Sequence, residues 1–396
     1  MRRMVYVCTD PGIPVFGRKG ASVHLQSVLR VLAARGVEAH LVCTRIGGLP
    51  PEGLEGVRVH ALPPVTGAAI VDRERSAMAA DLAVGSILDG LAAEAPVDLV
   101  YERYALWGQT GMSWAARRGV PSVLEVNAPL IQEQVQHRGL LDRGGAERVA
   151  DRALGAATAV ICVSDQVSGW ARARVGDPRT VHTVANGVDT TRIVPAHGHV
   201  RPAAGDPFTV GFVGTLKPWH GVDTLVEALP LLLRRHPGYR VLLVGDGPEA
   251  EALAVRAAGL GVAGWVEATG SVDPAAIGSL LKRMDVAVAP YPELTDFYFS
   301  PLKVYEYLAA GLPVVASEVG GLAGLLEHGR LGALVRPGDP SALAAAVEDL
   351  RLDVARRTRL RRSGVQRAAP SDWSHVVEKT LGLVGLTLPG VADAVA

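Results

Sequence analysis

The chain has 396 residues, enough for two or three domains, and its 40 Lys and Arg residues balance its 40 Asp and Glu residues. This neutral balance disfavours general nucleic-acid binding, and a hydrophobic content of 48% excludes a disordered chain. The three cysteines lie in apolar runs, and no secretion signal or membrane-spanning apolar run is visible, so we expect reduced thiols and a cytoplasmic protein.

Along the first half of the chain, short apolar runs alternate with longer stretches of helical period. The expected strands are 4–9, 38–44, 98–101, 121–126 and 159–163. The expected helices are 22–35, a segment within 73–95, and 146–154. Strands that alternate with helices predict a parallel sheet.

The same alternation restarts after a loop-like stretch at 194–207, which contains three Pro and two Gly. The expected strands are then 209–213, 240–244, 265–268, 286–289 and 313–316, and the expected helices are 223–235, 249–260, 274–282, 302–310 and 340–350. We therefore expect an α/β protein with two Rossmann-like, doubly wound domains that face each other across a cleft. The predicted boundaries are 1–192 for the first domain, completed by a helix at about 372–396, 193–207 for a linker and 208–371 for the second domain.

Residues 351–362 hold six Arg and one Asp, a density that an anionic membrane surface would attract. The apolar stripe of this segment is weak, so a solvated helix face is the favoured interpretation. We expect at most peripheral membrane contact.

The loop after the first strand contains Gly20, which lies at the start of the first expected helix. A glycine at a helix start lets backbone N–H groups approach a phosphate, and the positive end of the helix adds to the attraction. Gly17 and Gly20 lack the remaining glycine of a dinucleotide fingerprint, so a flexible turn is the competing explanation.

The loop that opens the second domain, Gly214-Thr-Leu-Lys-Pro-Trp-His-Gly221, places a cation and an imidazole between a strand and a helix. Lys217 can face a diphosphate from this loop, with His220 beside it. A merely solvated lysine is the alternative.

A further segment places Ser300 and Pro301 at an expected helix start, where backbone amides and the helix dipole favour an anion. Glu306 lies on the helix that follows, and its carboxylate can accept hydrogen bonds from vicinal hydroxyls such as those of ribose. A solvated glutamate explains the position equally well.

These loops belong to a set of segments that extends over nearly the whole chain: Gly20-Ala-Ser-Val-His24, Asn186-Gly-Val-Asp189, Phe212-Val-Gly-Thr-Leu216, Val244-Gly-Asp-Gly-Pro248 and Glu306-Tyr-Leu-Ala-Ala-Gly-Leu-Pro-Val-Val315. Together they resemble the retaining, nucleotide-sugar-dependent glycosyltransferases of family four, which have the GT-B fold. The resemblance is closest to the subset that contains Ser300-Pro-Leu-Lys303 and Lys217-Pro-Trp-His-Gly221.

The resemblance implies a nucleotide-sugar donor, with UDP favoured, and no cofactor or metal ion. Gly20 would pack against the diphosphate, and Lys217 with His220 would neutralise the departing phosphate. Glu306 would hold the ribose. The remaining donor contacts are expected from Tyr298, Ser300, Leu302, Lys303 and, beside the nucleobase, Val272.

The sequence departs from the family pattern at three places. Tyr298 occupies the position of the first Glu in the Glu-x7-Glu pattern, which leaves the donor sugar undefined. Asn127 stands where the family often presents a catalytic His, and its amide cannot titrate. Thr215 and His220 replace the usual Arg and Lys of the phosphate loop, so Lys217 must carry most of the positive charge.

The reaction expected from the resemblance is transfer with retention to an acceptor hydroxyl, with the leaving diphosphate as the base. His24, Glu102 and Glu125 are the expected acceptor contacts on the first domain, and ion pairs of the glutamates with Arg103 or Arg138 are the alternative. The acidic residues favour a small polar acceptor, such as an aminocyclitol or aminoglycoside core of antibiotic biosynthesis, over a polysaccharide or cell-envelope glycan. We expect a monomer or homodimer.

Two functions of another kind remain open. A nucleotide-sugar-binding scaffold without catalysis would tolerate loss of the sugar-side Glu and the His, and product formation separates it from a transferase. A sugar-nucleotide epimerase of the same fold would need acid–base carboxylates. A dehydrogenase is poorly supported, because neither half has the complete glycine fingerprint.

Overall fold

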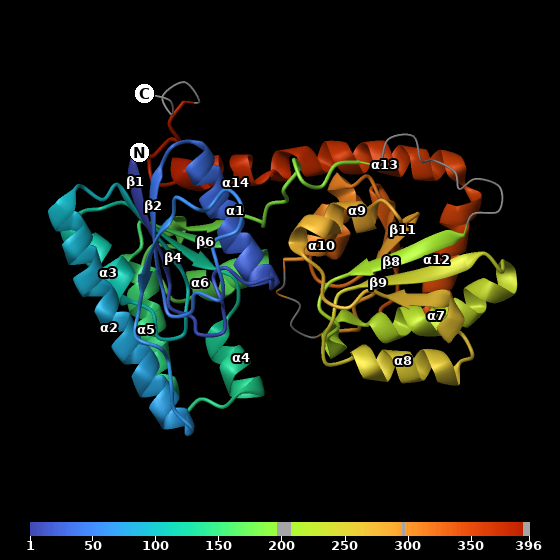
Figure 1. The fold of residues 1–396 in the computed structure, drawn as a ribbon, viewed down its shortest axis with the longest axis horizontal. Coiled ribbons are helices and arrows are strands. Elements are labelled where there is room, and N and C mark those ends of the chain that lie inside the picture. Colours follow the sequence, from blue (N-terminus) through green and yellow to red (C-terminus); the bar gives the residue numbers. More distant parts are fainter. Residues whose placement is uncertain (196–206, 295–297, 299, 391–396) are drawn as a thin grey trace. The chain divides into compact units, whose positions relative to one another are not determined.

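The computed structural model describes residues 1–195, 207–294, 298 and 300–390. It divides into two compact units, the first formed by Met1–Asn186, Tyr298–Ser300 and Trp373–Ala396, the second by Gly187–Phe297 and Pro301–Asp372. Each unit is built around one parallel sheet (Figure 1). The first unit therefore ends before the predicted boundary at residue 192, and most of the predicted linker lies outside the described residues.

The first unit contains a seven-stranded sheet in the order β3-β2-β1-β4-β5-β6-β7. Its strands are β1 (Arg3–Cys8), β2 (Glu38–Cys43), β3 (Arg58–Ala61), β4 (Leu99–Arg103), β5 (Ser122–Val126), β6 (Ala159–Cys162) and β7 (Val181–Thr183). Its helices are α1 (Gly20–Ala34), α2 (Ile70–Glu94), α3 (Thr110–Arg118), α4 (Leu130–His137), α5 (Arg143–Ala156), α6 (Asp165–Arg172) and α14 (Trp373–Gly382). The sequence did not predict β3 and β7, the two edge strands of this sheet, which are mostly half-buried or exposed and therefore lack a continuous apolar run.

Helices cover both faces of this sheet (Figure 1). Successive strand residues point to opposite faces. In β1, Met4 and Tyr6 pack in the core that contains residues of α1 and α14, whereas Val5 and Val7 pack in the core that contains residues of α2, α3 and α5. Burial on both faces explains why the strands read as continuous apolar runs.

The second unit contains a six-stranded sheet in the order β10-β9-β8-β11-β12-β13. Its strands are β8 (Phe208–Val213), β9 (Tyr239–Val244), β10 (Val266–Ala268), β11 (Val286–Ala289), β12 (Val314–Ser317) and β13 (Gly332–Val335). Its helices are α7 (Val222–Arg235), α8 (Ala250–Gly259), α9 (Ile277–Leu281), α10 (Leu302–Ala309), α11 (Leu322–Leu325), α12 (Pro340–Leu352) and α13 (Val354–Ala368).

Both sheets share one strand order, in which the first strand of the unit is central and the chain reverses direction across the sheet after the third strand. This is the doubly wound Rossmann order, and the predicted α/β class is confirmed. Ligands of such sheets bind outside the carboxyl ends of the strands at the switch point, which lies between β1 and β4 in the first unit and between β8 and β11 in the second.

The arginine-rich helix differs from its predicted environment. The arginine-rich segment 351–362 contributes to α13, where Leu360 and Arg357 are buried, so this face is only partly solvated. Arg357 donates to the carbonyl oxygens of Leu350 and Arg351 at the end of α12, an arrangement that neutralises the negative end of that helix.

Helix α2 alone among the described helices is long and apolar enough to cross a membrane, by length and composition only.

Candidate functional site

Three loops that contain glycine lie side by side at the carboxyl ends of β8, β9 and β10. Gly245 forms an isolated β-bridge with Gly270, and a Cβ atom on Gly245 would lie 2.1 Å from the carbonyl oxygen of Gly214. A Cβ atom on Gly247 would lie 2.3 Å from the carbonyl oxygen of Leu216. Only glycine allows the backbone of the loop after β9 to approach this closely. The loop after β8 therefore packs directly against the backbone of the loop after β9.

The loop after β8 presents Lys217 and His220 at this edge. Pro218–His220 form a short 3₁₀ turn that ends at Gly221, whose φ of +64° is in the left-handed region. Nδ1 of His220 donates to the carbonyl oxygen of Thr215, which leaves Nε2 of the neutral ring as an acceptor. Burial, with the nearby charge of Lys303, lowers the pKa of His220 to about 4. In this state His220 adds no positive charge, contrary to its predicted share in neutralising the phosphate.

Lys303, near the start of α10, reaches the same edge. Its Nζ atom lies 4.3 Å from the centre of the Phe212 ring and 4.9 Å from that of Tyr291. A Cβ atom on Gly214 would lie 3.4 Å from this Nζ, so the amine abuts the first residue after β8. The side chain is buried, with 8% of the residue exposed, and Nζ has no hydrogen-bond partner among the residues that the structure describes. Burial lowers the pKa of Lys303 to about 7, against the opposing effect of Glu306.

Glu306 lies on α10 and is half-buried. Burial raises its pKa to about 7, against the positive charges of Arg192 and Lys303. The sequence analysis did not identify Arg192, which follows the Asn-Gly-Val-Asp189 segment. Asp189 accepts hydrogen bonds from the backbone N–H groups of Thr191 and Arg192, and this local turn holds the arginine near Glu306.

The structure places the other predicted donor contacts in both units. Leu302 is the first residue of α10, and Val272 is half-buried in the loop after β10. Ser300 and Pro301 precede α10, as predicted, and no side-chain hydrogen bond caps this helix start. Tyr298 and Ser300 belong to the first unit. There the hydroxyl of Tyr298 donates to Glu133, and the hydroxyl of Ser300 is buried without a hydrogen-bond partner among the described residues.

In the first unit, Glu125 at the end of β5 is the centre of a buried hydrogen-bond network. Its Oε2 atom accepts from Tyr101 at 2.6 Å and lies 2.9 Å from Nε2 of His24. Its Oε1 atom accepts from Arg103 at 3.0 Å and from the side-chain amide of Asn127. These contacts, foremost those with His24 and Arg103, hold the pKa of Glu125 well below its usual range in spite of burial, which acts to raise it.

This network corrects the predicted role of Glu125 as an acceptor contact. A carboxylate offers about four lone-pair sites, and its four neighbours occupy them. The structure contains the ion pair between Glu125 and Arg103, which was the alternative to an acceptor contact. Nε2 of His24 is engaged in the same network. Because an ionised carboxylate can only accept, Asn127 must turn its amide nitrogen toward Glu125 and its Oδ1 away.

Glu102 is a second correction. Its residue is 0% exposed, and among the described residues no side chain pairs with either carboxylate oxygen, although the backbone N–H of Met112 lies near enough to favour the charged form. A Cβ atom on Gly111 would lie 2.3 Å from Oε2, so the carboxyl group is enclosed beneath α3. Burial, with the nearby charge of Asp81, raises the pKa of Glu102 well above its ordinary value. Such a position keeps Glu102 from any acceptor molecule.

Gly20, predicted to pack against the diphosphate, is the first residue of α1 and is exposed. No side-chain cap occupies this helix start, and no atom lies within 4 Å of a Cβ built on Gly20. The first backbone N–H groups of this 15-residue helix therefore lack a side-chain cap, and such a helix start suits an anion.

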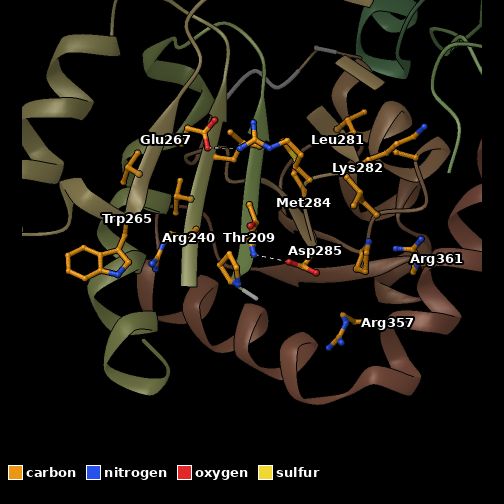
Figure 2. Close-up of a pocket in the computed structure, with 18 of the residues that line it drawn as sticks. Thr209, Arg240, Trp265, Glu267, Leu281, Lys282, Met284, Asp285, Arg357 and Arg361 are labelled. Atoms are coloured by element: carbon orange, nitrogen blue, oxygen red, sulfur yellow. Dashed lines mark hydrogen bonds and ion pairs between the residues drawn. The ribbon is translucent and has the colours of Figure 1, made fainter. Parts of the chain in front are cut away.

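A pocket of about 560 Å³ lies at the opposite edge of the second sheet, around the first residues of β8 and β9 (Figure 2). Arg283 pairs with Glu267 there, at 2.6 Å between Nη2 and Oε2, and the backbone N–H of Thr209 donates to Asp285. None of the predicted site residues lines this pocket. In the part of the chain that the structure describes, no group of three or more His, Cys, Asp or Glu side chains is placed to hold a metal ion.

Two Rossmann-like sheets are characteristic of GT-B glycosyltransferases. Residues 18–192 match the family model described as Glycosyltransferase Family 4, and residues 207–353 match the one described as Glycosyl transferases group 1. The D-inositol 3-phosphate glycosyltransferase of Acidothermus cellulolyticus is 30% identical over 96% of this chain and 89% of its own. The chain belongs to glycosyltransferase family 4, and it is an enzyme that uses a nucleotide-sugar donor.

Solved structures show the same fold. HepE of Anabaena in complex with UDP has a TM-score of 0.72 at 21% identity, with 97% of this chain and 100% of that chain covered. Sucrose-phosphate synthase of Thermosynechococcus elongatus has a TM-score of 0.72 at 21% identity, over 97% of this chain and 98% of that one. The GT-B fold implied by the family resemblance is confirmed.

Proposed function

We propose that the protein is a retaining glycosyltransferase that moves a sugar from a UDP-sugar donor to a hydroxyl of a small cyclic polyol and releases UDP. The observation that carries the proposal is that Lys303 and Glu306 lie on α10 at the carboxyl edge of the second sheet, where the charges of Lys303 and Lys217 both act on His220 in the loop after β8. Amines suit a diphosphate, and a carboxylate suits the vicinal hydroxyls of ribose. The structure of HepE with UDP, which has the same fold, supports UDP as the nucleotide.

In the proposed reaction, Lys217 and the start of α10 stabilise the negative charge that develops on the leaving diphosphate. The diphosphate accepts the proton of the acceptor hydroxyl while the sugar moves to that oxygen on the same face. Charged side chains and helix starts take the place of a metal ion. Asn127 contributes a carbonyl oxygen that accepts a hydrogen bond from a substrate hydroxyl.

We propose a cyclitol or aminocyclitol as the acceptor. Several relatives are named D-inositol 3-phosphate glycosyltransferase, and inositol phosphate is a phosphorylated cyclitol. The chain covers 89% of the length of both relatives, which supports a shared class of acceptor. A related amine-bearing cyclitol would belong to antibiotic biosynthesis.

The cysteines support a cytoplasmic location. Cys8 and Cys43 are direct neighbours on β1 and β2, yet both are free thiols, as is Cys162. Burial raises the pKa of Cys8 and Cys162 to about 12 and that of Cys43 to about 11. Protonated, buried thiols suit a reducing compartment.

The first test is a thermal-shift screen of the purified chain against UDP, GDP, dTDP and ADP. We expect UDP to stabilise the wild type and to lose this effect in Lys217→Ala and in Glu306→Ala. The matched controls are Lys282→Ala and Asp349→Ala, exposed residues of the same unit that lie after α9 and near the end of α12, away from this edge. Stabilisation lost equally in the controls, or no stabilisation by any nucleotide, would contradict the donor site.

The second test is turnover. The chain is incubated with UDP-glucose and either inositol 3-phosphate or an aminocyclitol, and the product is followed by mass spectrometry and by the NMR coupling of its anomeric proton. We expect a product that keeps the α configuration of the donor. Nucleotide binding without any product, across these acceptors, would favour the non-catalytic scaffold instead.

A further inference from the structure

We propose that Lys303 is the cation that receives the donor diphosphate, and that its amine takes up a proton from solvent when the diphosphate binds. This inference rests on the proposed function and deepens it, because it assigns the main phosphate-binding charge to α10 and not to the loop after β8 alone.

The first step of the argument is that Lys303 lacks a counter-ion contact suited to a permanent charge. Within the described part of the chain its Nζ atom has no hydrogen-bond partner, and it lies over the rings of Phe212 and Tyr291. An aromatic face compensates only part of the cost of burying an ammonium group. A buried lysine of this kind is partly neutral near pH 7, which agrees with the direction in which burial moves its pKa.

The second step is the position of the amine. It abuts Gly214 at the carboxyl end of β8, next to the switch point where Rossmann-like sheets bind their ligands. It also lies on the first turn of α10, whose helix start favours an anion. Thr215 and His220 occupy the two positions of the loop after β8 where the family usually has Arg and Lys. They carry an uncharged hydroxyl and a neutral imidazole. Lys303 is therefore the buried group best placed to meet a phosphate.

The third step is the balance of the binding event. The lone pair of Nζ binds one proton that a buffer acid or hydronium ion gives up, so one N–H bond forms, the bond of that proton to the buffer breaks, and the buffer is left as its conjugate base. The resulting ammonium donates hydrogen bonds to phosphate oxygens, and charge-assisted bonds of this type are strong when buried. During transfer the leaving diphosphate becomes more negative, so the same ammonium stabilises the transition state more than the bound donor.

Other titratable groups surround Lys303 and decide the conditions of the test. On α10 these are Glu306, with a pKa of about 7, and Tyr307, whose hydroxyl accepts a hydrogen bond from the backbone of Val213. Tyr291 follows β11, and burial raises its pKa. His220, with a pKa of about 4, and Lys217 lie in the loop after β8. At pH 8 Glu306 is already ionised and His220 is neutral, so a proton taken up by Lys303 is not masked by one released from Glu306.

The experiment is isothermal titration calorimetry of the full chain with UDP-glucose, without acceptor, in buffers of different ionisation enthalpy. UDP-glucose is the probe because its diphosphate does not titrate near neutral pH. The slope of the observed heat against the ionisation enthalpy gives the number of protons taken up. We expect uptake of about one proton at pH 8 and much less at pH 6, where Lys303 is already charged in the free protein.

Variants assign the proton. In Lys303→Met we expect the uptake to disappear and the affinity to fall roughly tenfold or more. Lys217→Met, the matched control, weakens binding and keeps the uptake. His220→Asn also keeps it. Thermal unfolding of each variant establishes that it is folded.

Three outcomes would overturn the inference while the proposed function stands: UDP-glucose binds without proton uptake, the uptake persists in Lys303→Met, or it disappears in His220→Asn instead. If neither UDP nor UDP-glucose binds at all, the proposed function fails, and this inference fails with it.

Discussion

Nε2 of His24 lies 2.9 Å from Oε2 of Glu125, although the two residues are 101 positions apart in the sequence. His24 belongs to α1 and Glu125 to β5, so the contact joins a helix to the strand that it covers. The pair is part of a buried network that also holds Tyr101, Arg103 and Asn127. Glu125 is therefore a residue that organises the first unit.

Replacement of Glu125 by Ala is expected to lower the free energy of unfolding by about 3–5 kcal/mol, because Arg103 is left as a buried charge without its partner. Urea denaturation of the variant and the wild type measures the difference. Glu55→Ala, at an exposed position of the same unit, is the control and should change stability very little. A similarly small loss in Glu125→Ala would contradict the network.

Glu125 also predicts an acid limb of stability. Its pKa is lowered in the folded state, so its contribution is present above the unfolded pKa of about 4.3 and is lost as the pH falls below that value. Glu125→Gln, which cannot ionise, should lack this part of the acid-side loss. Denaturation curves between pH 7 and pH 3 would refute the assignment if the two proteins lost stability in parallel.

Glu102→Gln is expected to stabilise the protein at neutral pH, by roughly 1–3 kcal/mol, because among the described residues no side chain pairs with the buried carboxyl group in its charged form. The pKa of Glu102 is raised in the folded state, so its favourable contribution is complete below the unfolded pKa of about 4.3 and is lost as the pH rises. The gain of the variant over the wild type should accordingly grow with pH. Thermal unfolding at pH 5 and pH 8 measures it, and a variant less stable at pH 8 would show that the carboxylate is needed.

Lys303→Met should separate stability from donor binding. The pKa of Lys303 is lowered to about 7 in the folded state, so the amine costs stability below its unfolded pKa of about 10.4, and the cost is largest at and below pH 7. Methionine removes this cost, and we expect a gain of the order of a few kcal/mol at pH 6 that shrinks toward pH 10. The same variant should lose stabilisation by UDP. If Lys303→Met were less stable than the wild type and were still stabilised by UDP, both expectations would be wrong.

Gly221→Ala is expected to disturb the loop that carries Lys217 and His220. The glycine has a φ of +64°, and a Cβ atom there would lie 1.9 Å from the carbonyl oxygen of Pro290. The backbone conformation alone costs an alanine about 1–2 kcal/mol, and the overlap with Pro290 adds to it. Chemical denaturation and UDP affinity measure the effect, with Gly259→Ala as the control, since no atom lies within 4 Å of a Cβ on that helical glycine. Equal behaviour of the two variants would show that the loop adapts.

Local pattern was sufficient to predict the fold class. Strands such as β1 and β8 are buried on both faces, and this burial produces apolar runs that are visible without any partner strand. The helices between them predicted parallel sheets in the same way. Edge strands that are only partly buried, such as β7, and the boundary between the units at Asn186, left no clear signal in the sequence.

The sequence identified residues of the site, whereas only the folded structure determined their contacts and protonation. Gly20, Lys217 and Glu306 could be singled out from the sequence because each lies in a short segment with its own characteristic residues, and residue type alone states which ligand group each can meet. The state of those groups depends on contacts between distant segments. Packing placed Glu102 beneath α3, surrounded Glu125 with four donors, and enclosed the amine of Lys303 between Phe212 and Tyr291. Burial and neighbouring charges determine the pKa of each of these groups, and both depend on the folded structure.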